Sequence, residues 1–133
     1  MLVLIPQAAV LDAWGLAAPY LDRAVKAGAL QSLEDWRSDC VTGAKQLWLL
    51  WSEQASCDGA GLTSLTGTPQ GKTCIIDAYG GRRGASDFNA LLPTLEAWAK
   101  AQGCQRVRVY GRIGWMEKLN GYALKGVILD RGL

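Results

Sequence analysis

The sequence predicts one α/β (α+β) domain with a mixed, mostly antiparallel sheet and flanking helices. Its 133 residues suffice for one domain, which would bury roughly two-thirds of its unfolded surface. Apolar residues recur at strand-like spacing in some segments and at helical spacing in others. Three consecutive strand-like segments in the middle of the chain are joined by short turns, as in an antiparallel meander. We therefore expect residues 1–133 to form a single domain.

The composition narrows the classes of function. Half of the residues are apolar and the formal net charge is +2, too small to favour a nucleic-acid or membrane partner. No apolar run approaches the roughly 20 residues that span a bilayer, and the apolar start lacks the basic region of a signal peptide. We expect a cytoplasmic protein. The absence of histidine removes the commonest general base and metal ligand, so we expect no metal site.

The first third of the chain is expected to contain a short strand and two helices. Leu2 to Ile5 is the candidate strand. Residues 7–27 have a helical pattern, which Pro19 is expected to divide because a proline inside a helix costs about 3 kcal/mol. Ser32, with an acidic residue three positions later, resembles a capping box and predicts the start of a second helix. Gly43 is its expected end.

The remaining chain alternates strands and helices. The turn between the first two strands of the meander is expected at Asp58-Gly59, a familiar hairpin dipeptide. A strand–helix–strand step after the meander should be a right-handed crossover that makes two strands parallel. The expected elements are strands at 45–53, 61–66 and 72–79, a helix capped by Ser86 or Asp87 and ended by Gly103, a strand at 105–112, a short helix at 114–120 and a strand at 123–130.

The junction between the third meander strand and the following helix is the most informative feature. Gly80, Gly81 and Gly84 permit backbone conformations that other residues resist. A helix N-terminus offers unpaired N–H groups and the positive end of the helix dipole to an anion. Arg82 and Arg83 add two formal charges there. The junction predicts a bound phosphate group, and a plain turn with solvated arginines remains the alternative.

The order of elements and the second half of the sequence resemble the GNAT-type N-acetyltransferases. Together with the tryptophan-rich first half, they look most like the small members encoded by bacteriophages. The resemblance covers residues 45–133 well and the first 44 residues by element order. It is carried by Cys74 to Ala85, Trp98 to Cys104, Gly111-Arg112-Ile113-Gly114-Trp115, Leu119 and Gly121-Tyr122.

The resemblance implies a GNAT-like fold and transfer of an acyl group, usually acetyl from acetyl-CoA (acetyl-coenzyme A), to an amine acceptor. In this family, two strands part beside the cofactor, and the backbone of the fourth strand holds its pantetheine arm. The N-terminus of the main helix takes the pyrophosphate. The cofactor-binding residues implied here are Tyr79, Gly80, Gly81, Arg82, Arg83, Gly84 and Ala85.

The candidate catalytic residues are Asp77, Tyr122 and Glu53. Asp77 is expected on the same side of its strand as Tyr79, where burial would raise its pKa and suit it to accept the proton of the amine. Its alternative role is a structural ion pair with Arg106 or Arg108. Tyr122 could act as the acid for the departing thiolate or simply pack. Glu53 could line the acceptor cleft or be solvated.

Two further hypotheses remain open. One is a catalytically inactive GNAT-like phage protein that binds a protein partner, located in a virion rather than in the cytoplasm of a bacterial host. It is favoured because only Gly84 matches the central glycine of the family's phosphate turn, and because Glu117 stands where members often carry a tyrosine acid. The other is nucleic-acid binding through Arg106, Arg108 and Arg112 on one strand face.

Overall fold

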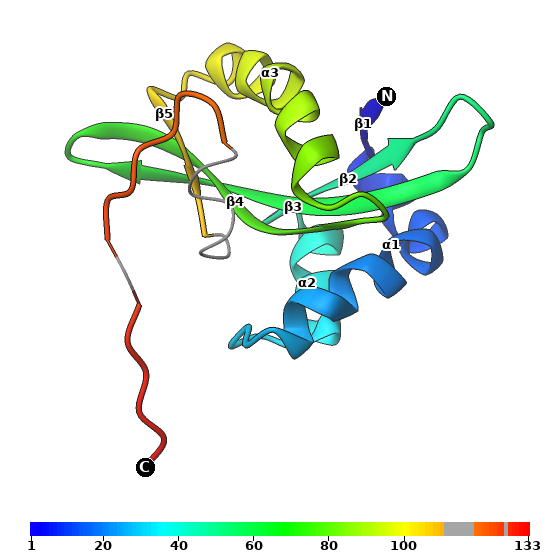
Figure 1. Cartoon of the computed structure of the whole chain (residues 1–133), viewed down its shortest axis with the longest axis horizontal. Coiled ribbons are helices and arrows are strands. Elements are labelled where there is room, and N and C mark those ends of the chain that lie inside the picture. Colours follow the sequence, from blue (N-terminus) through cyan, green and yellow to red (C-terminus); the bar gives the residue numbers. More distant parts are fainter. Residues whose placement is uncertain (111–118, 127) are drawn as a thin grey trace.

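The computed structural model describes residues 1–110, 119–126 and 128–133, without the side chains of residues 85 and 86. The central sheet carries α1 and α2 on one face and α3 on the other (Figure 1). The elements are β1 (Leu2–Leu4), the 3-10 helix η1 (Gln7–Ala9), α1 (Val10–Lys26), α2 (Leu33–Thr42), β2 (Gln46–Trp51), β3 (Cys57–Thr68), β4 (Gly71–Gly81), α3 (Ala85–Ala101) and β5 (Arg106–Val109).

The five strands form one sheet in the order β1-β2-β3-β4-β5. The first three pairings are antiparallel, and β4 pairs with β5 in parallel. A parallel pair needs a long crossover connection, which α3 provides here. The predicted fold class and the antiparallel meander are therefore confirmed, as is the parallel step after α3.

Each face of the sheet has its own apolar core. Leu47 and Leu49 of β2 pack towards α1 and α2, whereas Trp48 between them packs towards α3. Because both faces are covered, β2 is apolar from Leu47 to Trp51. The Trp48 indole N–H donates to Thr63 Oγ1 (3.0 Å), and its ring meets Trp98 edge-on with centroids 5.1 Å apart.

Helix boundaries differ from the expected ones at two places. The expected division at Pro19 is wrong, since α1 runs unbroken through it. Ala17 and Leu21 on either side are completely buried, and this packing offsets the cost of the proline. The expected caps Ser86 and Asp87 of α3 are also wrong, because Gly84 is the N-cap residue and the helix begins at residue 85. The predicted capping box at Ser32 is confirmed.

Two strand predictions need correction. The Asp58-Gly59 pair lies inside β3 instead of in a turn, because β3 begins at Cys57 and the connection from β2 is residues 52–56. The described part of 123–130 forms no strand. It extends away from the domain (Figure 1), with Leu124, Ile128 and Leu129 exposed. An apolar pattern forms a strand only where a neighbouring backbone pairs with it.

Some expectations fall outside the described residues. These are most of the short helix at 114–120, the end of the strand at 105–112, and Glu117. In the described part of the chain, no helix has the length and apolar character needed to cross a membrane.

Helix α1 approaches the end of β4 so closely that residue 80 must be glycine. Replacing Gly80 by Ala should lower the free energy of unfolding by about 3 kcal/mol, because the new Cβ would meet the backbone carbonyl of Tyr20. Urea unfolding measures this loss. Gly15→Ala is the matched control, since a Cβ there meets nothing within 4 Å and alanine favours a helix over glycine by about 1 kcal/mol. Equal stabilities of the two variants would contradict the close approach.

Candidate functional site

The candidate site begins where β4 and β5 part. Their parallel ladder joins Thr73–Ile76 of β4 to Arg106–Val109 of β5, and the last bond runs from the Tyr110 N–H to the Ile76 carbonyl (3.4 Å). β4 continues for five more residues, from Asp77 to Gly81, paired with β3 alone among the described residues. Among the described residues, this stretch therefore has no pairing partner on the β5 side.

A β-bulge marks the point of parting. Thr63 of β3 pairs with Ile76 and Leu62 pairs with Ala78, so Asp77 is the extra residue of β4. Alternation from Ile75 puts the Asp77 side chain on the face of Ser64, whose hydroxyl donates to Asp77 Oδ2 (2.8 Å), and the bulge then returns Tyr79 to the α3 face. The same oxygen is 3.2 Å from Lys45 Nζ in an ion pair whose side chains are 13% and 18% exposed.

Two expectations about Asp77 are thus corrected. Its side chain and that of Tyr79 point to opposite faces, because Tyr79 stacks on Phe88 of α3 while Asp77 contacts Ser64 and Lys45. Its ion-pair partner is Lys45 and not an arginine of β5. A single bulge reverses the alternation that the sequence pattern assumes. Whether the Asp77 carboxylate takes part in catalysis remains a prediction.

The N-terminus of α3 lies at the end of β4. Gly84 is its N-cap residue with φ 62° and ψ −133°, and no side chain caps the helix. The Phe88 N–H bonds to the Gly84 carbonyl (3.3 Å), so the preceding N–H groups of the first turn have no partner four residues back. Asp87 adds one negative charge to this turn, which opposes the attraction of an anion.

Tyr79 lies beneath that turn in a cradle of glycines. Its ring is stacked on Phe88 with centroids 4.7 Å apart. A Cβ at Gly81 would be 2.6 Å from its hydroxyl, and one at Gly59 would be 3.1 Å away. The side chain is 8% exposed, and its hydroxyl has no hydrogen-bond partner among the described residues. Burial, and then the nearby charge of Asp87, raise the pKa of Tyr79.

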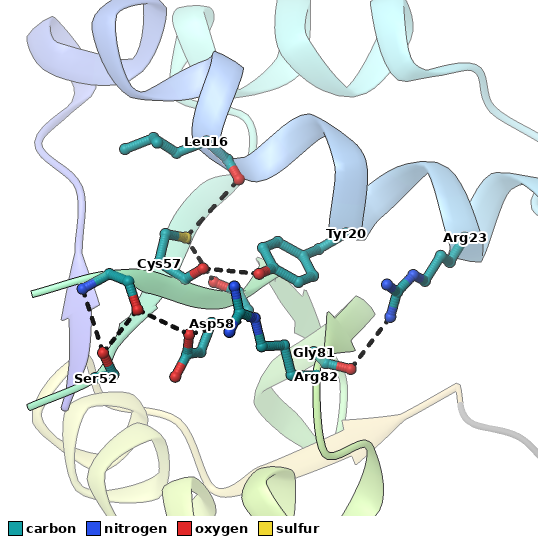
Figure 2. Close-up of polar contacts among 10 residues, drawn as sticks. Leu16, Tyr20, Arg23, Ser52, Cys57, Asp58, Gly81 and Arg82 are labelled. Carbon is teal, nitrogen blue, oxygen red and sulfur yellow. Dashed lines mark hydrogen bonds and ion pairs between the residues drawn. The ribbon is translucent and has the colours of Figure 1, made fainter. Parts of the chain in front are cut away.

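Arg82 follows β4 in a network that ties the turn to α1 and β3 (Figure 2). Its backbone N–H donates to the Asp58 carbonyl (2.9 Å), and its Nε lies 3.6 Å from Asp58 Oδ1. The pKa of Arg82 is raised by its hydrogen bond to the Tyr20 hydroxyl and by the charge of Asp58. The Arg23 guanidinium donates to the Gly81 carbonyl (3.3 Å). Two guanidinium groups, those of Arg23 and Arg82, therefore flank the C-terminal end of β4.

Of the other predicted site residues, Tyr122 and Glu53 lie on other parts of the chain than this turn. The Tyr122 hydroxyl donates to Glu96 Oε2 on α3 (2.9 Å). Partial burial, then this bond to Glu96, raise the pKa of Tyr122. Glu53 is exposed in the connection between β2 and β3, consistent with the solvated alternative. Arg83 is exposed in the turn itself, and Gly80 contacts α1.

Sequence reasoning missed the residues that support the site from other elements. Lys45 and Ser64 were not singled out, although a carboxylate in an apolar strand requires a partner. Tyr20, Arg23 and Asp58 were missed as well, because their contacts join residues 24 to 58 positions apart and no local motif signals such a contact.

The described residues contain no group of three or more Cys, Asp or Glu side chains that could hold a metal ion. They do fit a phosphate-bearing co-substrate. Exposed arginines stand beside an N-terminus without a side-chain cap, and β4 leads up to it.

Solved structures share this architecture. A mutant of the BH1408 protein from Bacillus halodurans has a TM-score of 0.73 at 11% identity, covering 100% of this chain and 99% of that one. The ribosomal-protein-alanine N-acetyltransferase of Brucella melitensis biovar Abortus has a TM-score of 0.69 at 14% sequence identity, and the match covers 99% of both chains. A GNAT family acetyltransferase of Staphylococcus aureus has a TM-score of 0.67 at 17% sequence identity, and the match covers 100% of this chain and 98% of that one. No protein-family model and no curated protein matches the sequence. The chain has the fold of the GNAT acetyltransferases.

Two buried thiols predict a loss of stability in alkali. Burial raises the pKa of Cys40 and of Cys74 from 9.0 to about 12. Between these values the unfolded chain loses both protons while the native chain keeps them, so the free energy of unfolding should fall as the pH rises from 9 to 12. Iodoacetamide should label the less buried Cys57 and Cys104 before Cys40 and Cys74. Equal labelling of all four would contradict their burial.

The Tyr79 hydroxyl is expected to lower the free energy of unfolding. Tyr79→Phe keeps the ring on Phe88 and removes a buried polar group without a partner among the described residues, so it should raise the free energy of unfolding by about 1 kcal/mol. Tyr20→Phe is the control, because that hydroxyl donates to the Cys57 carbonyl (2.7 Å) and its loss should destabilise the chain. A Tyr79→Phe variant less stable than the parent would show that the hydroxyl is bonded.

Proposed function

We propose that the chain is an acyl-CoA-dependent N-acyltransferase that transfers an acetyl group to an amine. The observation that carries the proposal is the N-terminus of α3, which has no side-chain cap and closely follows the end of β4. Asp77–Gly81 leads to it beyond the pairing of β4 with β5 among the described residues. A thioester cofactor has an extended arm with amide groups and a pyrophosphate at one end. A free strand edge complements the arm, and a helix N-terminus complements the pyrophosphate.

The bound co-substrate would supply an activated acyl carbon, and the residues of this chain would position it. In this proposal the backbone groups of residues 77–81 hold the arm, while Arg82, Arg83 and the N–H groups that follow Gly84 hold the phosphates. The amine nitrogen attacks the acyl carbon, the carbon–sulfur bond breaks, and the sulfur leaves as a thiolate. Amide N–H groups beside the bulge can stabilise the oxyanion that forms in between.

Two protons must move in this reaction. The amine loses one, and the Asp77 carboxylate is the proposed acceptor at the point of parting. Its Oδ2 already accepts a hydrogen bond from Ser64 and forms an ion pair with Lys45. The carboxylate would therefore orient the amine and take its proton through the other oxygen or a water molecule. The thiolate gains one, for which Tyr122 is the proposed donor. Its raised pKa makes it a weak acid. Glu53 is proposed only at the rim of the acceptor cleft.

A second candidate function is a catalytically inactive binding protein with the same fold. The observations that favour it are the Asp87 carboxylate in the first turn of α3 and the pairing of Arg82 with Asp58. Both reduce the positive charge offered to a phosphate. We propose in that case a protein partner in a phage assembly and a place in the virion, whereas the enzyme would act in the cytoplasm of a bacterial host.

Acetyl-CoA should raise the melting temperature by several degrees at about 100 times its Kd. The double variant Arg82→Ala with Arg83→Ala should abolish most of this shift, because it removes the formal charges beside the phosphates. Differential scanning fluorimetry measures both. The matched control is Lys125→Ala with Arg131→Ala, which removes the same charge from the exposed C-terminal segment and should keep the shift.

The outcomes separate the two candidates. No shift in the parent chain at millimolar acetyl-CoA would reject the transferase and leave the binding protein. A shift that the arginine variant retains would instead place the phosphates elsewhere on the molecule.

A further inference from the structure

The outer strand of the sheet carries a basic stripe that the proposed transfer reaction does not use. Val107 and Val109 pack into the core on the α3 side. Arg106, Arg108 and Tyr110 alternate with them and therefore point to the opposite face. All three are exposed, Tyr110 at 53%. We name these three residues the basic stripe.

The register places the basic stripe beside the point of parting. Arg108 is the neighbour of Ile75 in β4, and Ile75 is the neighbour of Ser64 in β3. Residues opposite one another in a sheet share a face, so Arg108 lies on the same face as Ser64. Asp77 is bonded to that serine. The stripe therefore leads along β5 to Tyr110, whose N–H bonds to the Ile76 carbonyl of β4 next to Asp77.

The charges on this face do not cancel. Asp77 is neutralised by Lys45 at 3.2 Å. The Asp39 carboxylate of α2 accepts a hydrogen bond from Gln31 (3.4 Å), a neutral side chain that does not offset its charge, so one carboxylate stands against two arginines. Among the described residues, Arg106 and Arg108 have no ion-pair partner. The acceptor side of the site thus keeps two guanidinium groups, which suit carboxylate or phosphate oxygens.

We propose that the acceptor is an acidic peptide whose amine enters at Asp77 while its carboxylates bind the basic stripe. This inference rests on the proposed transferase function and names its substrate class. Alternate residues of an extended peptide are about 7 Å apart, the same separation as Arg106 and Arg108 along their strand. A peptide lying along β5 can therefore place a carboxylate on each arginine. The charge of Lys45 also disfavours an acceptor with cations beside its amine.

The experiment compares two peptide libraries with free N-terminal amines. One has Asp or Glu at alternate positions, and the other has Asn or Gln there. Binding by calorimetry, and thiol release from acetyl-CoA, should favour the acidic library by roughly tenfold or more. Arg106→Gln with Arg108→Gln should abolish the preference and keep the melting shift with acetyl-CoA. Lys125→Gln with Arg131→Gln removes the same charge elsewhere and should keep the preference.

The two levels of the proposal fail separately. If acetyl-CoA neither binds nor is consumed, the transferase is rejected, and calorimetry still tests the stripe. If acetyl-CoA binds but the two libraries behave alike, the acidic acceptor is rejected and the transferase stands. A single-stranded oligonucleotide that binds more tightly than the acidic library, and loses its affinity in the Arg106→Gln, Arg108→Gln variant, would assign the stripe to nucleic acid and overturn the proposal.

Discussion

The candidate site depends on the parallel ladder between β4 and β5, which among the described residues ends at Ile76 and Val109. β4 continues to Gly81, and both faces of this stretch are covered. Helix α1 covers one face at Gly80, and the stacked rings of Tyr79 and Phe88 fill the other. Because α3 begins shortly after β4 ends, the backbone of residues 77–81 leads directly to a helix N-terminus.

The bulge at Asp77 determines which side chains of β4 point to each face of the sheet. Before it, Cys74 and Ile76 serve the α3 core. After it, Tyr79 returns to that core, while Asp77 is held on the other face by a serine and a lysine. A ligand arm along residues 77–81 would therefore meet an acidic group only on the face away from α3. This separation supports a model in which cofactor and acceptor approach from different sides.

Much of the fold could be predicted because its signals are local. Alternation in β2, the apolar stripe of α3 and the capping box at Ser32 each reflect neighbours within a few residues. The site was predicted less well. The glycines and arginines of the turn indicated an anion site, but the placement of Asp77 and Tyr79 on opposite faces depends on one bulge, and the partner of Asp77, Lys45, comes from the start of β2. The C-terminal strand failed because pairing requires a partner that a pattern does not supply.

The glycine cradle makes the residues at positions 59, 79 and 81 depend on one another. A Cβ at Gly81 would meet the end of the Tyr79 side chain, whereas a Cβ at Gly59 would meet the backbone carbonyl of Gly80 first and the Tyr79 hydroxyl second. A larger residue at position 81 can therefore be accepted only with a smaller one at 79, and a larger residue at position 59 also requires the backbone of residue 80 to shift. In a divergent set of related chains positions 79 and 81 should change together, while position 59 should stay glycine.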